Sequence, residues 1–244
     1  WIASMLGWLA LKLPVAPLLW HAHEMLFGFA AAVIIGFLLT AVKAWTGLAT
    51  PRGALLGALA LLWLAARVAA VVAPYAVYAL LDVALLPVVA GILLGVLLRA
   101  RNRRNLPLIG MLVLLALANG VFHLAVLGVV HLPPLQALYG GLALIVMIES
   151  VMAGRVVPAF TMSVNPGLKL RVPHLLEHAT VAITALTLAL WVWAPAGAGL
   201  LTAVLAGLAA VVHALRMVRW KPWITRHRPI LWILHASYAW IPVG

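Results

Sequence analysis

Long apolar runs recur along the chain, separated by short polar or proline-rich connections. Runs of about 18 or more nearly uncharged residues are typical of membrane-spanning helices, because a bilayer core takes about 20 apolar residues to cross. The runs predict helices at 1–12 (the end of one helix), 17–42, 54–73, 77–98, 107–130, 135–157, 176–194, 197–217 and 229–244. The pattern therefore predicts an all-α, polytopic transmembrane helix bundle with about eight to nine spans.

Both ends of the chain fall inside apolar runs. The first run reaches Lys12 after too few residues to cross a hydrocarbon core of about 30 Å, and the last run still continues at Gly244. We therefore expect residues 1–244 to form a single transmembrane helical domain, truncated at both ends, that belongs to a longer chain.

Positive charges gather in every second connection between the runs. Of the 16 Lys and Arg residues, 14 lie in or beside the connections 43–53, 99–106, 158–175 and 218–228. Arg155 and Arg216, near the ends of their runs, are counted with the last two. Cytoplasmic loops of membrane proteins carry an excess of Lys and Arg. We therefore expect these connections at the cytoplasmic face, and the tight hairpins at 73–75, 131–134 and 194–197 on the outer side.

Composition narrows the class of protein further. Hydrophobic residues make up 67% of the chain and charged residues 8%, whereas soluble domains have about 25% charged residues. The net charge of +12 lies mostly in the connections, as membrane topology requires, so the expected partner is the lipid bilayer and not nucleic acid. Cysteine is absent, which excludes disulfides, c-type haem attachment, iron–sulfur clusters and thiolate copper sites within residues 1–244. A metal here must use histidine, carboxylate or thioether ligands.

Arg67 lies inside the predicted span 54–73, where a charge is costly unless it is paired or functional. The following hairpin turns near Pro74 and Tyr75, and Asp82 is as far beyond the turn as Arg67 is before it. Antiparallel helices place such residues at the same depth, so we expect an Arg67–Asp82 ion pair. A second interpretation has Arg67 also bind a cofactor carboxylate such as a haem propionate.

Two histidines and a glutamate open the predicted helix 17–42, in the order His21, His23 and Glu24. In a regular α-helix His21 and Glu24 share a face, and His23 points elsewhere. We therefore expect His21 to be the metal or haem ligand that faces the bundle, with Glu24 beside it. His23 would then serve a different site or pack against neighbours.

Small residues continue the face of Glu24 at Gly28, Ala32 and Gly36. Such a stripe permits close approach of another helix, or of the flat face of a porphyrin. The stripe by itself leaves both interpretations open.

His123 is the expected partner across the bundle. It lies about two-thirds of the way outward along the span 107–130, with Asn119 one turn earlier on the same face. That depth matches Arg67 and Asp82. A lone membrane histidine is often a hydrogen-bonded core residue, but the shared depth of these polar groups makes His123 a candidate ligand.

Three further polar residues lie toward the cytoplasmic side. Glu149 is expected to be buried, where it would be paired, protonated or part of a proton path. His235 is another candidate cofactor ligand, whereas His213 is expected at the membrane interface.

The run His174-Leu-Leu-Glu-His178 matches the H-x-x-E-H pattern of a class of zinc peptidases. No third ligand lies near it in the sequence. We interpret the run as a solvated first helical turn, with Glu177 favoured by the helix dipole. The sequence contains no Gly-rich phosphate loop, Ser–His–Asp arrangement or nucleotide motif.

Several motifs together carry a resemblance to a known family. The longest is WHAHEMLFGF at Trp20–Phe29, which continues as GFLLTAV at Gly36–Val42. Shorter motifs follow in order: RRN at 103–105, ANG at 118–120 with His123, MAGRVVP at 152–158, RW at 219–220, LWILH at 231–235 and YAW at 238–240. In these residues the chain resembles the NnrS family of bacterial membrane proteins.

The resemblance implies a multi-pass protein of the bacterial inner (cytoplasmic) membrane with about twelve spans in the full chain. It also implies bound haem and copper, and a link to nitric oxide metabolism and nitrosative stress in denitrifying bacteria. Without cysteine, the expected haem is b-type. Nitric oxide and other membrane subunits are the partners that this interpretation adds.

Three functions remain open from the sequence. The first is a haem- and copper-binding protein that relieves nitrosative stress. The second is a transporter for a metal, haem or small solute, with the buried polar residues along its path. The third is a cofactor-free structural or assembly subunit, in which Arg67–Asp82 and Glu149 only hold the helices together.

Overall fold

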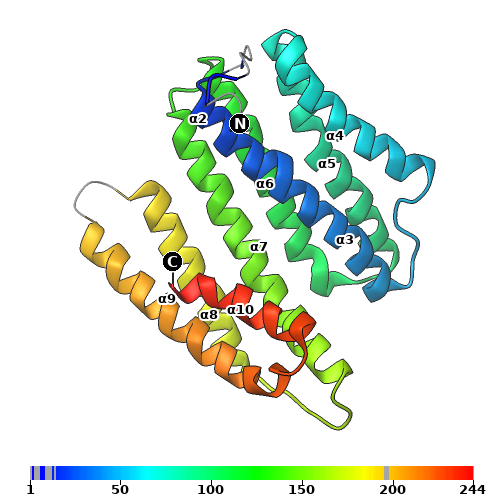
Figure 1. Ribbon diagram of the computed structural model, residues 1–244, viewed down its shortest axis with the longest axis vertical. Coiled ribbons are helices and arrows are strands. Elements are labelled where there is room, and N and C mark those ends of the chain that lie inside the picture. The colour runs from blue at the N-terminus through cyan, green and yellow to red at the C-terminus, as the bar shows by residue number, and fades with distance from the viewer. Residues whose placement is uncertain (1, 3–5, 9–12, 14, 195–197, 244) are drawn as a thin grey trace. The chain divides into compact units, whose positions relative to one another are not determined.

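The computed structural model describes residues 2, 6–8, 13, 15–194 and 198–243. The chain forms two compact units, Trp1–Leu144 and Ile145–Gly244, and helix α7 belongs to both (Figure 1). The helix end expected at 1–12 and the hairpin expected at 194–197 lie largely outside the described residues.

The first unit begins with a long helix made of three parts. These are α2 (Pro17–His23), the π-helix η1 (Glu24–Ala30) and α3 (Ala31–Thr46). The other elements of the unit are α4 (Ala54–Val72), α5 (Tyr75–Arg99), the short 3₁₀-helix η2 (Arg103–Asn105), α6 (Leu106–Val126) and the first part of α7 (Pro134–Ser163). Gly47 ends α3 in the left-handed conformation (φ 70°), and its N–H donates to the Lys43 carbonyl at 2.9 Å.

Helix α5 is the centre of the first unit, because it packs against α3, α4 and α6. Figure 1 shows α4 and α5 running side by side along most of their length. The side chains of Leu86, Val89 and Leu93 on α5 are fully buried. Asp82 is buried about one turn before Leu86, and Tyr78 about two turns before it. The same helix therefore supplies both apolar core residues and polar groups to the interior.

The second unit consists of the rest of α7, α8 (His174–Trp193), α9 (Gly199–Arg219), the 3₁₀-helix η3 (Pro222–Thr225) and α10 (Pro229–Val243). Helix α9 packs against both α8 and α10. Val157, Trp220 and Tyr238 form a buried cluster that joins α7, the end of α9 and α10. Aromatic and aliphatic side chains thus anchor the short α10 to its neighbours.

Seven helical segments of the described residues are long and apolar enough to cross a membrane, and α10 is a shorter apolar helix. Leucine and valine side chains are exposed along α4 and α9, among them Leu61, Val68, Leu208 and Val211. Such surfaces fit contact with lipid tails. The predicted all-α transmembrane helix bundle is confirmed, and the predicted spans match the observed helices within a few residues at most ends.

Candidate metal centre

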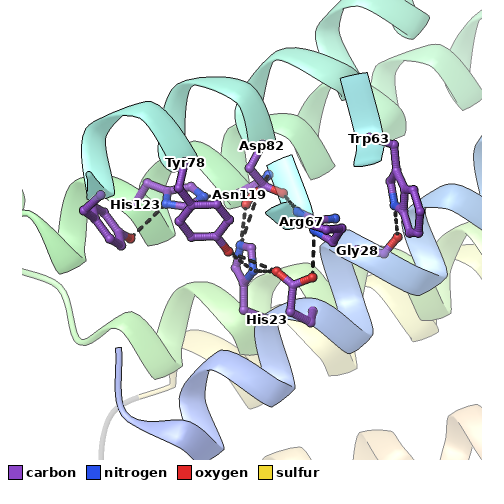
Figure 2. A network of polar contacts seen from close by, with 10 residues as sticks. His23, Gly28, Trp63, Arg67, Tyr78, Asp82, Asn119 and His123 are labelled. Atoms are coloured by element: carbon purple, nitrogen blue, oxygen red, sulfur yellow. Dashed lines mark hydrogen bonds and ion pairs between the residues drawn. The ribbon is translucent and has the colours of Figure 1, made fainter. Parts of the chain in front are cut away.

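A buried polar cluster occupies the interior of the first unit. Its side chains come from the first part of the long first helix, from α4, from the first turns of α5, and from α6 (Figure 2). We call this group the His–Asp cluster: His23, Glu24, Arg67, Tyr75, Tyr78, Asp82, Asn119 and His123. These residues lie far apart in the sequence, so the packing of four helices brings them together.

Three potential ligands converge at the centre of the His–Asp cluster. Each of His23, Asp82 and His123 offers one ligand atom, and these atoms all lie within 4.8 Å of one another. Asp82 Oδ2 lies 3.5 Å from His23 Nε2 and 3.2 Å from His123 Nε2. The three residues are 0%, 5% and 3% exposed. Two imidazoles and a carboxylate that face one another in a dry interior form a donor set that suits a transition metal.

A tyrosine hydroxyl holds the other nitrogen of each imidazole. The Tyr75 hydroxyl lies 2.9 Å from His123 Nδ1, and the Tyr78 hydroxyl lies 3.1 Å from His23 Nδ1. Tyr78 also donates a hydrogen bond to Glu24 Oε1 at 3.0 Å. Hydrogen bonds at Nδ1 fix the ring orientation. His123 Nε2 therefore points to Asp82 Oδ2, and His23 Nε2 points to Asp82 Oδ2 and to Asn119 Oδ1, which lies 2.9 Å away.

Arg67 joins the two carboxylates of the cluster. Its Nη2 forms an ion pair with Asp82 Oδ1, and its Nε lies 2.8 Å from Glu24 Oε2. Asn119 donates from Nδ2 to Asp82 Oδ2 at 2.7 Å. Asp82 therefore uses one oxygen for the arginine and turns the other toward Asn119 and the histidines.

Gly28 allows the ion pairs of Arg67 to form. A Cβ at this position would lie 2.8 Å from Glu24 Oε2 and 3.0 Å from Arg67 Nη1. The Gly28 carbonyl accepts a hydrogen bond from Trp63 Nε1 at 2.9 Å (Figure 2). A larger residue would push the arginine away from the π-helix.

A second buried polar cluster lies in the second unit, centred on Arg216, which is 1% exposed. We call it the Arg216 cluster. The guanidinium donates to Glu177 Oε2 at 2.5 Å, to the Ser150 carbonyl at 2.9 Å and to the Tyr238 hydroxyl at 3.2 Å. His213 Nδ1 lies 2.5 Å from the same tyrosine hydroxyl, and its Nε2 lies 2.8 Å from Thr184 Oγ1. Each of the two ring nitrogens of His213 therefore has a hydroxyl group as its hydrogen-bond partner.

The NnrS protein family model matches the chain over residues 1–244. The chain belongs to the NnrS family. No curated protein and no solved structure matches it. Membership in NnrS, together with the long apolar helices, makes this a multi-pass membrane protein of a family related to nitric oxide and associated with haem and metal binding.

In this NnrS family member the predicted Arg67–Asp82 ion pair is confirmed. The expectation that Asn119 and His123 share a face is also correct, because both side chains bond to Asp82. Tyr75 and Tyr78 were missed. Their signal is in the spacing: they lie seven and four residues before Asp82 on one helix, so all three share a face.

The expectation that His23 points away from the bundle is wrong. His23 is fully buried in the cluster, whereas His21 is only partly buried and contributes no ligand atom to the converging group. The physical reason is the π-helix at 24–30, whose turn is wider than that of the α-helix assumed from the sequence. Glu24, expected beside His21, contacts His23, with Oε1 3.4 Å from His23 Nδ1.

The small-residue stripe does not form one packed face. Gly28 is buried against Glu24 and Arg67, but Ala32 is only partly buried and Gly36 is exposed. Apart from the chain neighbours and the backbone of its own helix, no heavy atom of the described residues lies within 4 Å of the position that a Gly36 Cβ would take. The change of helical pitch rotates the later members of the stripe away from the first.

Three expectations for the second unit are corrected. Arg216, counted with a cytoplasmic connection, lies on α9 with its side chain buried in the unit. Its burial is possible because Glu177 pairs with its charge and Tyr238 accepts one of its hydrogen bonds. His213, expected at the interface, is 1% exposed. Glu149, expected to be buried, has an exposed side chain on α7.

The two remaining predicted sites of the second unit behave differently. Helix α8 begins at His174, and both His174 and His178 are exposed, which agrees with a first helical turn. Glu177 in that turn pairs with Arg216, a contact that the sequence did not predict. His235 is 4% exposed, and its Nδ1 lies 3.2 Å from the Leu231 carbonyl. Its buried Nε2 has no hydrogen-bond partner within the described part of the chain.

Proposed function

We propose that this NnrS family member is a haem- and copper-binding protein of the bacterial inner membrane that relieves nitrosative stress in denitrifying bacteria. The observation that carries the proposal is the convergence of His23, His123 and Asp82, each of which offers one ligand atom within 4.8 Å of the other two. Buried groups of this kind are expensive in a membrane interior unless they have a function or saturate one another.

The His–Asp cluster fits copper better than a porphyrin. Imidazole and carboxylate ligands suit Cu(II), and tyrosine hydroxyls on both Nδ1 atoms resemble the outer partners that usually orient metal-bound histidines. The His23 ring lies only 4.4 Å from the Phe122 ring, centroid to centroid, and 5.1 Å from the Phe27 ring. A flat macrocycle would have to displace these rings, whereas a small ion would have to fit only among the three ligand atoms. Arg67 is held by Glu24 and Asp82, so we assign it to the ion pair.

His235 is the residue that we propose as a haem ligand. Its Nδ1–H is directed to the Leu231 carbonyl, which leaves the unprotonated Nε2 as the ligand atom. Because Nε2 is buried without a partner in the described residues, a bound iron would satisfy it. A b-type haem held there would supply an iron centre that binds nitric oxide.

Metal analysis and absorption spectroscopy of the purified full-length protein test the proposal. We expect stoichiometric copper and a Soret band. Changing His23 or His123 to Ala should abolish copper binding, whereas His21→Ala, a matched change on the same helix, should retain it. His235→Ala should remove the Soret band and leave copper in place.

A cofactor-free structural role is the second candidate. Asp82 already contacts Arg67, Asn119 and His123, and His23 Nε2 lies 2.9 Å from Asn119 Oδ1, so the charged groups and both imidazoles have protein partners without a metal. Protein with an intact helical circular dichroism spectrum but neither copper nor a Soret band would overturn the first proposal and favour this one. Copper that survives His23→Ala and His123→Ala together would place the metal elsewhere.

A further inference from the structure

The second unit contains a cationic pocket of about 250 Å³ near the start of α8 and the end of α9. Its charged lining residues are Lys169, Arg171, Arg219 and Lys221. We call it the four-cation pocket. Two segments about fifty residues apart in the sequence form it, so the fold gathers charges that the sequence places in two separate connections.

The turn after α9 positions half of the pocket. Trp220 is fully buried, and the N–H groups of Trp220 and Lys221 bond to the carbonyls of Met217 and Val218. Lys221 takes a left-handed conformation with φ 53°, which is uncommon for a residue with a side chain. The buried indole and this backbone turn place Arg219 and Lys221 on either side of the anchor, where both line the pocket.

Among the described residues, no acidic side chain pairs with the cations of the pocket. The whole chain has only four acidic residues, and two of them, Glu149 and Glu177, are in the second unit. Glu177 is paired with Arg216. Within the described residues, none of the four pocket cations forms an ion pair or a side-chain hydrogen bond. Four positive charges around one concavity therefore favour a ligand with concentrated negative charge.

The apolar part of the lining indicates what kind of anion this is. Leu170, Val218 and Trp223 complete the wall, and Val218 and Trp223 are 51% and 55% exposed. An exposed tryptophan beside cations is typical of a membrane interface. A small soluble anion has no apolar groups that could contact these side chains. A phospholipid has its phosphate next to glycerol and acyl groups, which could contact them.

We propose that the four-cation pocket binds the phosphate headgroup of an anionic phospholipid from the adjoining leaflet. The charge pattern predicts that this connection faces the cytoplasm, where anionic lipids attract basic segments. The first unit offers a comparison: a cavity of about 360 Å³ there is lined by Arg101 and Arg103 with three leucines. With half as many cations, that cavity should bind the same headgroup more weakly.

Native mass spectrometry of the full-length protein in neutral detergent tests the proposal. We expect phosphatidylglycerol to bind at least tenfold more tightly than phosphatidylcholine. Each cation near anionic lipid contributes about 1 kcal/mol, which corresponds to about fivefold in affinity. The double change Arg171→Gln/Arg219→Gln should therefore weaken phosphatidylglycerol binding by at least tenfold.

The matched control is Arg226→Gln/Arg228→Gln, which removes the same charge from exposed cations that do not line the pocket. It should change the affinity less than about threefold, because distant exposed charges are screened by salt. If the first variant does not fold, Lys169→Gln/Lys221→Gln removes the same charge from the same pocket.

Three results would overturn the proposal. Equal loss in the pocket and control variants would mean that only net charge matters. Equal affinities for phosphatidylcholine and phosphatidylglycerol would mean that the pocket does not distinguish headgroups by their charge. Millimolar inorganic phosphate that displaces the lipid, and binds as well in its absence, would assign the pocket to a soluble anion.

Discussion

The two units bury similar polar residues and combine them differently. Each unit has an arginine paired with carboxylate in its interior, and each places histidine and tyrosine beside that pair. In the His–Asp cluster, one arginine serves two carboxylates, and two imidazoles face a carboxylate oxygen. In the Arg216 cluster, one arginine forms an ion pair with one carboxylate, and the imidazole of His213 lies between two hydroxyls.

This difference is the reason that we propose a metal-ligand set in the His–Asp cluster and a structural network in the Arg216 cluster. A carboxylate oxygen between two imidazole nitrogens provides the negative charge and the lone pairs that a metal cation needs. Hydroxyls on both sides of His213 provide neither a charge nor a second imidazole. We therefore expect changes in the Arg216 cluster to alter stability alone. Changes in the His–Asp cluster should alter both stability and metal binding.

The largest effect is expected from Arg216→Ala. This change leaves Glu177 without its partner and opens a cavity beside Trp220 and Tyr238, whose rings the guanidinium covers. Glu177 is 29% exposed, so the loss of the ion pair and the loss of the packing of the guanidinium together should cost about 3–5 kcal/mol. Denaturant unfolding followed by circular dichroism in lipid-free neutral detergent measures the change, with Arg219→Ala on the exposed side of α9 as the control.

The copper content of Arg216→Ala sharpens the comparison. Folded Arg216→Ala protein should still bind copper, because the proposed ligands all lie in the first unit. Loss of copper from protein that keeps its helical content would show that the two clusters do not act separately.

The Arg67–Asp82 pair is expected to show the next largest effect. Each single change to Ala should destabilise the protein strongly, because it leaves a buried charge unpaired. The double change should cost less than the sum, by about 0.5–3 kcal/mol of interaction energy. A double-mutant cycle from unfolding free energies measures this value. Strict additivity would contradict the ion pair.

The smallest effect is expected from Tyr78→Phe. Removing the hydroxyl leaves His23 Nδ1 without its tyrosine partner while the ring still fills its site. Loss of an outer hydrogen-bond partner of a metal ligand typically weakens metal affinity by about 10–100-fold. Copper titration of the apoprotein measures the affinity, and Tyr139→Phe on α7 is the control. An unchanged affinity in Tyr78→Phe would separate this tyrosine from the metal site.

The sequence predicted the parts of the site that depend on regular geometry. Arg67 and Asp82 were paired correctly because two antiparallel helices joined by a tight turn place equidistant residues at one depth. Asn119 and His123 were paired correctly because residues four apart share a face of an α-helix. Neither argument needs knowledge of the tertiary packing beyond one hairpin or one helix.

The errors arose where the local geometry or the burial was unusual. His23 was directed to the wrong side because a constant helical period was assumed through the π-helix at 24–30. Arg216 was counted with the cytoplasmic connection after its run, and its burial was missed because its partner Glu177 comes from another helix. The burial of that pair depends on how α8 and α9 pack against each other, so the sequence of either helix by itself does not predict it.

The π-helix has a consequence for how the site could be altered. A π-helical turn holds more residues than an α-helical turn over a similar rise, so η1 behaves as a short insertion in an otherwise regular helix. Deleting a single residue within 24–30 would restore the regular period and rotate His23 and Glu24 relative to everything after Ala31. Substitution scanning leaves chain length unchanged and would never sample this transition. A one-residue insertion or deletion within 24–30 is therefore a change that could create or remove the site in a single step.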